Sequence, residues 1–288
     1  MVHRPPASIC AHVAKNVAAG VLFVHAIGTA QAADASSWDR GLRSAMRLIA
    51  ASAAMEGGAT ALRAGIEIKL DKGWKTYWRY PGDSGVPPRF DFKRSHNVRS
   101  VSVKWPAPHR FSDDGGQSIG YKDHVIFPLS VVPDDPRKPV TLRLDLDYAI
   151  CEKLCVPAEA KAELALKPVR TAHEAALTAA EARVPKLAAV GAPSLPAIHA
   201  VTREHAASPR IIVDVAAPKG APVDLFVEGP TANWALPLPE PVAGAPAGAQ
   251  RFAFALDGLP SDAKVEGAVL TLTAVAGETA VEVTYRLD

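Results

Sequence analysis

The stretch Thr141-Leu-Arg-Leu-Asp-Leu-Asp147 alternates strictly between leucine and a polar or charged residue. Successive side chains of a strand point to opposite faces, so the three leucines share one face and the charged residues share the other. The pattern predicts a half-buried β-strand. Alternation resumes at Ala162, Leu164 and Leu166, which predicts a second strand after a short connection.

Segments of the same kind lie on both sides of this pair. Many short strands with little helix predict an all-β fold of two immunoglobulin-like sandwiches. One helix is expected over residues 171–184, with Thr171 as its N-cap and Pro185 closing it, followed by a linker. Pro128 predicts an edge strand or a bulge. The predicted strands cover residues 64–70, 98–103, 125–132, 209–215, 223–227, 251–256, 268–275 and 279–287.

The N-terminal segment has the layout of a secretory signal peptide. An uncharged, mostly apolar run at residues 17–29 follows Arg4 and Lys15 and precedes the small-residue site at residues 30–32. The run is too short to span a bilayer comfortably, and no later segment is long and apolar enough to do so. The mature product is expected to be exported to the periplasm, without a membrane span.

Four parts are expected along the chain. They are a signal peptide (1–32), a first β-sandwich with the cysteine pair (33–170), a helical linker (171–194) and a second β-sandwich (195–288). Loss of residues 1–32 removes two of 32 basic residues and none of 30 acidic ones, which leaves 30 of each. A net charge near zero argues against nucleic acid as a partner.

Cys151 and Cys155 are the only cysteines left once Cys10 leaves with the signal peptide. Closing a loop of about five residues stabilises a fold by about 2 kcal/mol, against about 3 for a fifteen-residue loop. A chain of this size can bury a full core, so a redox role is favoured over a structural staple or a soft-metal site. The flanking strand patterns and Pro157 indicate a bent, non-helical connection. Lys153 is the only cation nearby in the sequence.

Two further stretches are candidates for the surroundings of the cysteines. Residues 73–88 hold four aromatic residues within seven positions, which indicates core packing or, for Tyr77 or Trp78, a wall that excludes solvent from the pair. Residues 105–121 read as a long glycine-containing loop, either a lid or an ordinary solvated loop. The sequence has no nucleophile elbow, phosphate loop or dinucleotide fingerprint, and its histidines have no zinc spacing.

The runs GWKTYWRYPGDSGVPP, WPAPHRF, GYKDHVIFPL and YAICEKLCVPAEA resemble the periplasmic N-terminal region of DsbD/ScsB-type thiol:disulfide interchange proteins. The resemblance is close over about residues 44–166. It implies an immunoglobulin-like fold whose cysteine pair carries electrons from a membrane thiol-electron transporter to thioredoxin-like periplasmic proteins. It also implies that Cys155 forms the mixed disulfide and that Cys151 resolves it.

The same resemblance implies a cap over the pair, in the loop before Gly120 and Tyr121. The family's shielding phenylalanine aligns with Asp114, and Phe111 lies nearby as an alternative. Tyr121 is counted with the cap and pocket residues. The family's membrane and thioredoxin-like domains are absent from this sequence, so the cysteine pair is expected to be recharged by another polypeptide.

Two other functions remain open at this stage. One is a Cu(I)-binding module linked to copper tolerance, although Met46 and Met55, the methionines outside the signal peptide, have no paired spacing. The other is a non-catalytic adaptor with an inert disulfide. No cofactor and no set of metal ligands is predicted.

Overall fold

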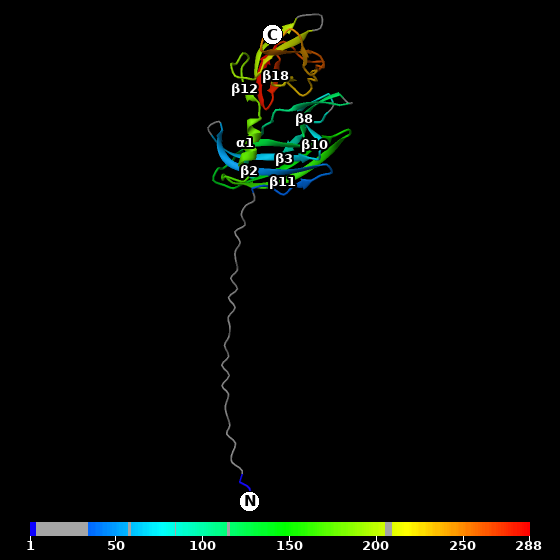
Figure 1. The fold of residues 1–288 in the computed structure, drawn as a ribbon. Coiled ribbons are helices and arrows are strands. Elements are labelled where there is room, and N and C mark those ends of the chain that lie inside the picture. The colour runs from blue at the N-terminus through cyan, green and yellow to red at the C-terminus, as the bar shows by residue number, and fades with distance from the viewer. Residues whose placement is uncertain (4–33, 57–58, 84, 114–115, 205–208) are drawn as a thin grey trace. The chain divides into compact units, whose positions relative to one another are not determined.

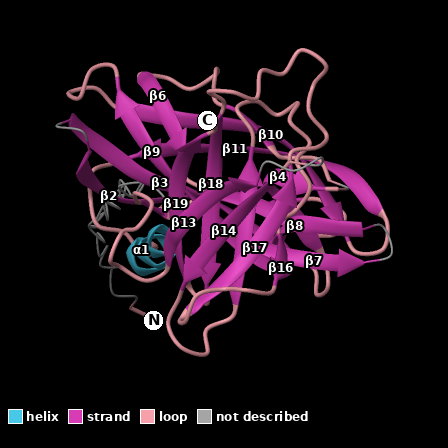
Figure 2. Cartoon of the chain, turned by 90° about the horizontal axis from the view of Figure 1, so that it is seen from above, coloured by secondary structure: helices cyan, strands magenta, loops and turns pink. Residues whose placement is uncertain are grey.

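The computed structural model describes residues 1–3, 34–56, 59–83, 85–113, 116–204 and 209–288. The predicted signal peptide therefore lies outside the described residues, apart from its first three. Within the described residues the chain is nearly all β-strand with one helix, as the alternating pattern predicts (Figure 2). The strands form two β-sandwiches of two sheets each, drawn from blue to green and from yellow to red in Figure 1.

The first sandwich has a five-stranded and a six-stranded sheet. In order, the five-stranded sheet consists of β1 (Asp39–Arg40), β2 (Ser44–Glu56), β3 (Ala59–Leu70), β9 (His124–Pro133) and β6 (Val98–Val103). The six-stranded sheet consists of β11 (Cys155–Leu166), β10 (Val140–Cys151), β4 (Lys75–Gly82), β8 (Gly116–Lys122) and β7 (His109–Asp113), while β5 (Arg89–Asp91) also pairs with β10.

The leucines of the alternating stretch build the core of this sandwich. Leu142, Leu144 and Leu146 are at most 1% exposed, and they belong to one buried cluster with Phe127 of β9. The charged residues between them lie on the opposite face of β10. The predicted half-buried strand is confirmed, and its continuation as β11 forms a hairpin with it.

The expectation of an edge strand or a bulge at Pro128 is wrong, since the β3–β9 register runs through Pro128 without a shift. Its strand β9 lies between β3 and β6, and Pro128 itself pairs with Gly65. The carbonyl of Pro128 accepts a hydrogen bond from the backbone N–H of Lys104, one residue beyond the end of β6. The N–H that proline lacks would point to this same side, where the ladder has already ended, so no ladder bond is lost.

The helix α1 (Glu174–Ala182) is shorter than the predicted range 171–184. Its N-cap is His173 and not Thr171, and no side chain caps it. Thr171 instead accepts a hydrogen bond from the backbone N–H of His173 and donates one to the carbonyl of Ala50 in β2. The segment before the helix is thereby tied to the first sandwich.

The helix also packs on the first sandwich. Leu177 and Ala180 are buried in a cluster with residues of β2 and β9. Arg63 of β3 forms ion pairs with Glu174 and Glu181 on the helix. The segment predicted as a linker is therefore in large part a docked element.

The second sandwich consists of two four-stranded sheets. The first is β12 (Lys186–Leu187), β19 (Thr279–Arg286), β18 (Val269–Ala276) and β15 (Val223–Glu228). The second is β13 (Ala197–Glu204), β14 (Arg210–Ala216), β17 (Ala249–Ala255) and β16 (Glu240–Val242). Because β12 pairs with β19, part of the predicted linker 171–194 already belongs to this sandwich. The remaining domain boundaries stay a prediction.

Charged and aromatic contacts join the two sandwiches. Arg79 of β4 forms ion pairs with Glu228 of β15 and Glu282 of β19. The rings of Trp78 and Phe226 lie 5.7 Å apart between centroids. Arg79 and Trp78 both lie on β4, the strand that pairs with β10 of the cysteine hairpin. Contacts with the second sandwich therefore help to fix this strand in place.

The outer strand β7 is anchored to the second sandwich as well. Arg110 binds Asp224 at 2.8 Å and Glu240 at 3.0 Å, and it donates to the carbonyls of Leu225 and Pro239. The hairpin of β7 and β8 is thus fixed at one side to β4 and at the other to the second sandwich.

Candidate redox site

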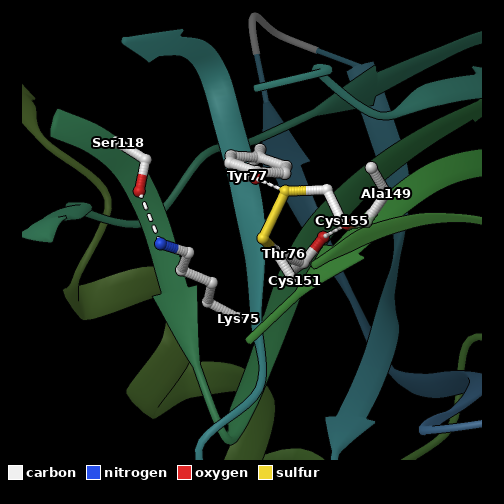
Figure 3. Close-up of a disulfide and its surroundings, with 7 residues drawn as sticks. All are labelled: Lys75, Thr76, Tyr77, Ser118, Ala149, Cys151 and Cys155. Carbon is white, nitrogen blue, oxygen red and sulfur yellow. Dashed lines mark hydrogen bonds between the residues drawn. A yellow bond between two sulfur atoms is a disulfide. The ribbon is translucent and has the colours of Figure 1, made fainter. Parts of the chain in front are cut away.

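The two cysteines form the last residue pair of the β10–β11 hairpin. The ladder pairs residues 140–151 with residues 155–166, and it ends with Cys151 opposite Cys155. Their Cα atoms are 4.1 Å apart and their sulfurs are bonded to each other (Figure 3). Residues 152–154 turn the chain between the strands. The predicted bent, non-helical connection is confirmed.

The two cysteines of the hairpin differ in their exposure to solvent. Cys151 is 5% exposed, whereas Cys155 is exposed. Leu154, which precedes Cys155 in the chain, is 73% exposed. Cys155 is therefore the more exposed of the two cysteines, and it follows an exposed apolar residue.

Tyr77 lies directly against the pair. Its hydroxyl is 3.0 Å from Sγ of Cys155, and because a disulfide sulfur carries no hydrogen, the hydroxyl donates (Figure 3). Tyr77 is 1% exposed and forms a small buried cluster with Ala149 and Cys151. A Cβ at Gly85 would lie 2.6 Å from the Tyr77 ring, so the chain passes close over the ring at a glycine.

Lys75 is part of the same site and was missed by the sequence analysis. The register pairs Cys151 with Lys75 of β4 on one side and with Cys155 of β11 on the other. Paired residues point their side chains to the same face, so the three lie in one row across three strands. Lys75 is buried, at 7% exposure. Only the strand register shows that Lys75 lies opposite Cys151, since about 75 residues separate the two in the chain.

The structure gives Phe111 a place beside Lys75. Nζ of Lys75 donates to Oγ of Ser118 at 2.9 Å and lies 5.7 Å from the centroid of the Phe111 ring. Phe111 of β7 is paired with Ser118 of β8, so the β7–β8 hairpin borders this face of the sheet. Asp114, the other cap candidate, lies outside the described residues. Shielding of the cysteines by the cap stays a prediction.

Trp78 and Tyr121 do not fit the role of pocket wall, and this expectation is corrected. Both are buried in the large cluster that holds the core of the first sandwich and that also includes Phe226 of the second. Trp78 follows Tyr77 in the strand and therefore points to the opposite face. Tyr121 stacks edge-on against Phe127 at 5.2 Å between centroids and donates its hydroxyl to the carbonyl of Pro106.

The described residues offer little to a metal ion. No group of three or more His, Cys, Asp or Glu side chains among them is arranged to hold one. Met46 is fully buried in the core, and the sulfur of Met55 accepts a hydrogen bond from Thr60. Neither methionine is placed beside the cysteines to serve as a third soft ligand.

Comparison with known proteins agrees with the fold. Residues 45–167 match the family model described as thiol:disulfide interchange protein DsbD, N-terminal. Among solved structures, the N-terminal periplasmic domain of ScsB from Proteus mirabilis superposes with a TM-score of 0.68 at 20% sequence identity. The match covers 88% of this chain and 98% of that one, and so extends beyond residues 45–167. No curated protein sequence matches the chain.

Residues 45–167, which make up most of the first sandwich, are thus similar to the DsbD N-terminal family. The likeness to the ScsB domain shows the fold. In the part of the chain that the structure describes, no helix is long and apolar enough to cross a membrane.

Proposed function

We propose that this protein is a periplasmic thiol-disulfide interchange protein that passes electrons through Cys151 and Cys155. The observation that carries the proposal is the asymmetric hairpin, in which an exposed cysteine, Cys155, and a buried cysteine, Cys151, are held as a cross-strand pair. Exchange requires one accessible sulfur and a second cysteine that resolves the mixed disulfide. The family of residues 45–167 supports this assignment.

Electron flow through the pair takes two exchange steps. The Cys155 thiolate attacks one sulfur of a client disulfide, forms a Cys155–client bond and releases the other client sulfur as a thiolate. Cys151, as thiolate, then attacks Cys155, which forms the internal disulfide and releases the client dithiol. To restore the pair, one thiolate of an external dithiol attacks Cys155, and the electron pair of the broken bond passes to Cys151. The donor's second thiolate then attacks its own sulfur in the mixed disulfide, which releases Cys155 as a thiolate and leaves the donor as a disulfide.

The Tyr77 hydroxyl contributes to the first step. A hydrogen bond donated to a sulfur stabilises its thiolate relative to its thiol, which lowers the thiol pKa. Tyr77 donates to the exposed sulfur, Cys155. The hydroxyl therefore increases the fraction of Cys155 that is ready to attack at neutral pH.

The partners that suit this chemistry are thioredoxin-fold proteins of the periplasm as clients and a membrane-linked dithiol as electron donor. The exposed Leu154 next to Cys155 offers such clients an apolar contact beside the reacting sulfur. A structural staple is the weaker alternative. The hairpin is already held by twelve residue pairs, and closing so short a loop adds only about 2 kcal/mol.

The test is to trap clients on a Cys151→Ala variant in periplasmic extracts. Without the resolving sulfur, clients should stay disulfide-linked to Cys155, and mass spectrometry should identify thioredoxin-fold proteins. A variant lacking both cysteines is the control and should trap none. Recovery of only the unmodified monomer would contradict the proposal.

The reduction potential of the isolated pair separates exchange from scaffolding. Structural disulfides typically have potentials below about −300 mV, whereas exchanging ones lie higher. We expect a value above this limit. A pair that resists mild dithiols while the protein stays folded would favour the adaptor.

A further inference from the structure

The cysteine row contains a cation that the exchange scheme has not yet used. Lys75 sits on β4 directly opposite Cys151, on the same face of the sheet. Across such a pair the Cβ atoms are about 4.5–5.5 Å apart, which is within reach of a lysine side chain. In Figure 3 the Lys75 side chain and the disulfide lie on the same side of β4.

Contacts with Ser118 and Phe111 help to hold the Lys75 ammonium on this face. It donates to the Ser118 hydroxyl at 2.9 Å and lies 5.7 Å from the centroid of the Phe111 ring. Lys75 is 7% exposed, so bulk water screens its charge far less than that of a surface lysine. By contrast, Lys153 in the hairpin turn is exposed, and so is Lys122 of β8, which is paired with Lys75.

Burial creates a difficulty that a cation can relieve. When the disulfide opens, Cys151 is left as a thiolate at 5% exposure, and apolar surroundings disfavour a charged sulfur. Tyr77 donates its hydroxyl to Cys155, the exposed cysteine. A cation near Cys151 would stabilise the thiolate of the buried cysteine directly.

We propose that Lys75 is the positioning residue of the buried sulfur and that its ammonium stabilises the thiolate that Cys151 becomes when the disulfide opens. This inference rests on the proposed exchange function. A dithiol sulfur bonds to Cys155, the bond between Cys155 and Cys151 breaks, and its electron pair stays on Cys151 beside Lys75. A better-stabilised leaving thiolate departs faster, so Lys75 promotes recharging of the pair.

Several other titratable groups surround Cys151 and enter the design of the test. On β4, β8 and β11 they include Tyr77, Lys122 and Cys155. On β7 and in the turn they include His109, Glu152 and Lys153. The test therefore compares variants that differ in one of these groups at a time.

The experiment measures the pKa of Cys151 in a Cys155→Ala background, from the pH dependence of its alkylation by a small electrophile. Replacing Lys75 with methionine keeps the length of the side chain and removes its charge. An opposite charge within about 4–6 Å shifts a pKa by about 1–3 units, so we expect Lys75→Met to raise the Cys151 pKa by at least about one unit. Lys75→Arg should restore it.

Lys153→Met is the matched control and should change the Cys151 pKa by much less, because its ammonium is solvated. An unchanged Cys151 pKa in Lys75→Met, or an equal rise in Lys153→Met, would overturn the proposal. A structural role alone would not distinguish Lys75→Arg from Lys75→Met by pKa.

A second measurement needs no substitution at Lys75. Coupling between two sites is reciprocal, so the NMR signal of the Lys75 side chain should titrate with the Cys151 thiol in the reduced Cys155→Ala protein. A Lys75 signal that ignores this titration would contradict the inference. If clients are trapped on Cys155 but Lys75→Met leaves the Cys151 pKa unchanged, only the proposed role of Lys75 is contradicted. If no client is trapped, the exchange function itself is contradicted.

Discussion

The two β-sandwiches bury similar aliphatic cores but place their polar groups differently. On the first, the face of β4, β10 and β11 turned away from the core carries Lys75, Tyr77 and the cysteine pair. On the second, the carboxylates of Asp224 and Glu228 point to arginines of the first sandwich. The chemistry is thus confined to one sandwich, while charges of the other hold the strands that border it.

The sharpest test of this division is Cys155→Ser. We expect exchange with client disulfides to be lost, because the accessible sulfur is gone. The free energy of unfolding should fall by only about 2 kcal/mol, the value for so short a loop. A coupled assay with a disulfide-bonded thioredoxin-fold substrate and urea unfolding measure the two effects. Residual exchange through Cys151 would contradict the assignment of Cys155 as the attacking cysteine.

Arg79→Met tests the second sandwich as a support. It leaves Glu228 and Glu282 facing each other without their shared cation, at side-chain exposures of 19% and 20%. Breaking a buried pair costs about 3–5 kcal/mol, and partial exposure reduces this to about 2–4 here. Urea unfolding measures the loss. Arg43→Met is the control, since its pair with Asp71 is exposed and worth at most about 1 kcal/mol.

The rate of thiol-disulfide exchange by the Arg79→Met variant should stay close to that of the native chain. The rate is measured under conditions in which the variant remains folded. If this variant folds and yet exchanges disulfides slowly, the second sandwich takes part in the exchange chemistry and is not only a support.

Acid should loosen the helix α1 from the first sandwich. A hydrogen bond from the Ser52 backbone, followed by the Ser52 hydroxyl and Arg63, outweighs burial and lowers the pKa of Glu174 from 4.5 to about 2. A lowered carboxyl pKa contributes stability that is complete above pH 4.5 and is lost as the pH falls toward 2. Glu174→Gln should therefore destabilise the protein by about 2 kcal/mol at neutral pH.

The same variant should lose less stability between pH 4.5 and pH 2 than the native chain does. Thermal unfolding across this range measures the difference. Glu163→Gln serves as the control, because its ion pair with Arg143 is solvent-exposed. Parallel acid profiles for Glu174→Gln and the native chain would contradict the assignment.

The most local change is Tyr77→Phe, whose effect is expected on the pKa of one thiol. It removes the hydroxyl that donates to Cys155 and leaves the ring in place. A hydrogen bond to a charged group contributes about 1.5–3 kcal/mol, so the Cys155 pKa should rise by about 1–2 units. Alkylation kinetics in a Cys151→Ala background measure this. Tyr80→Phe, which loses a hydrogen bond to the carbonyl of Leu236, is the control and should leave Cys155 unchanged.

Local pattern was enough to predict the cysteine hairpin and the all-β fold. Period-two alternation is a property of neighbouring residues, and it identified β10 and its partner β11 from residues 141–166 alone. The approximate position of the helix also followed from its composition. Its cap did not, because Thr171 bonds to β2 instead of serving as N-cap.

Features that depend on register could not be predicted. Tyr77 and Trp78 are adjacent aromatic residues, and only the fold decides that the first faces the cysteines and the second the core. Lys75 was missed for the same reason, whereas Lys153 was named because it is near in sequence. Pro128 misled because its missing N–H lies past the end of β6, which sequence cannot reveal.

The long ladder of the β10–β11 hairpin has a kinetic consequence. Twelve residue pairs hold the Cα atoms of Cys151 and Cys155 4.1 Å apart, and these backbone bonds do not depend on the state of the sulfurs. Oxidation and reduction then need little more than side-chain rotation. The hairpin backbone would then keep the same conformation in both redox states. The rate of turnover would be set by association and dissociation of partner proteins and not by refolding of the strand ends.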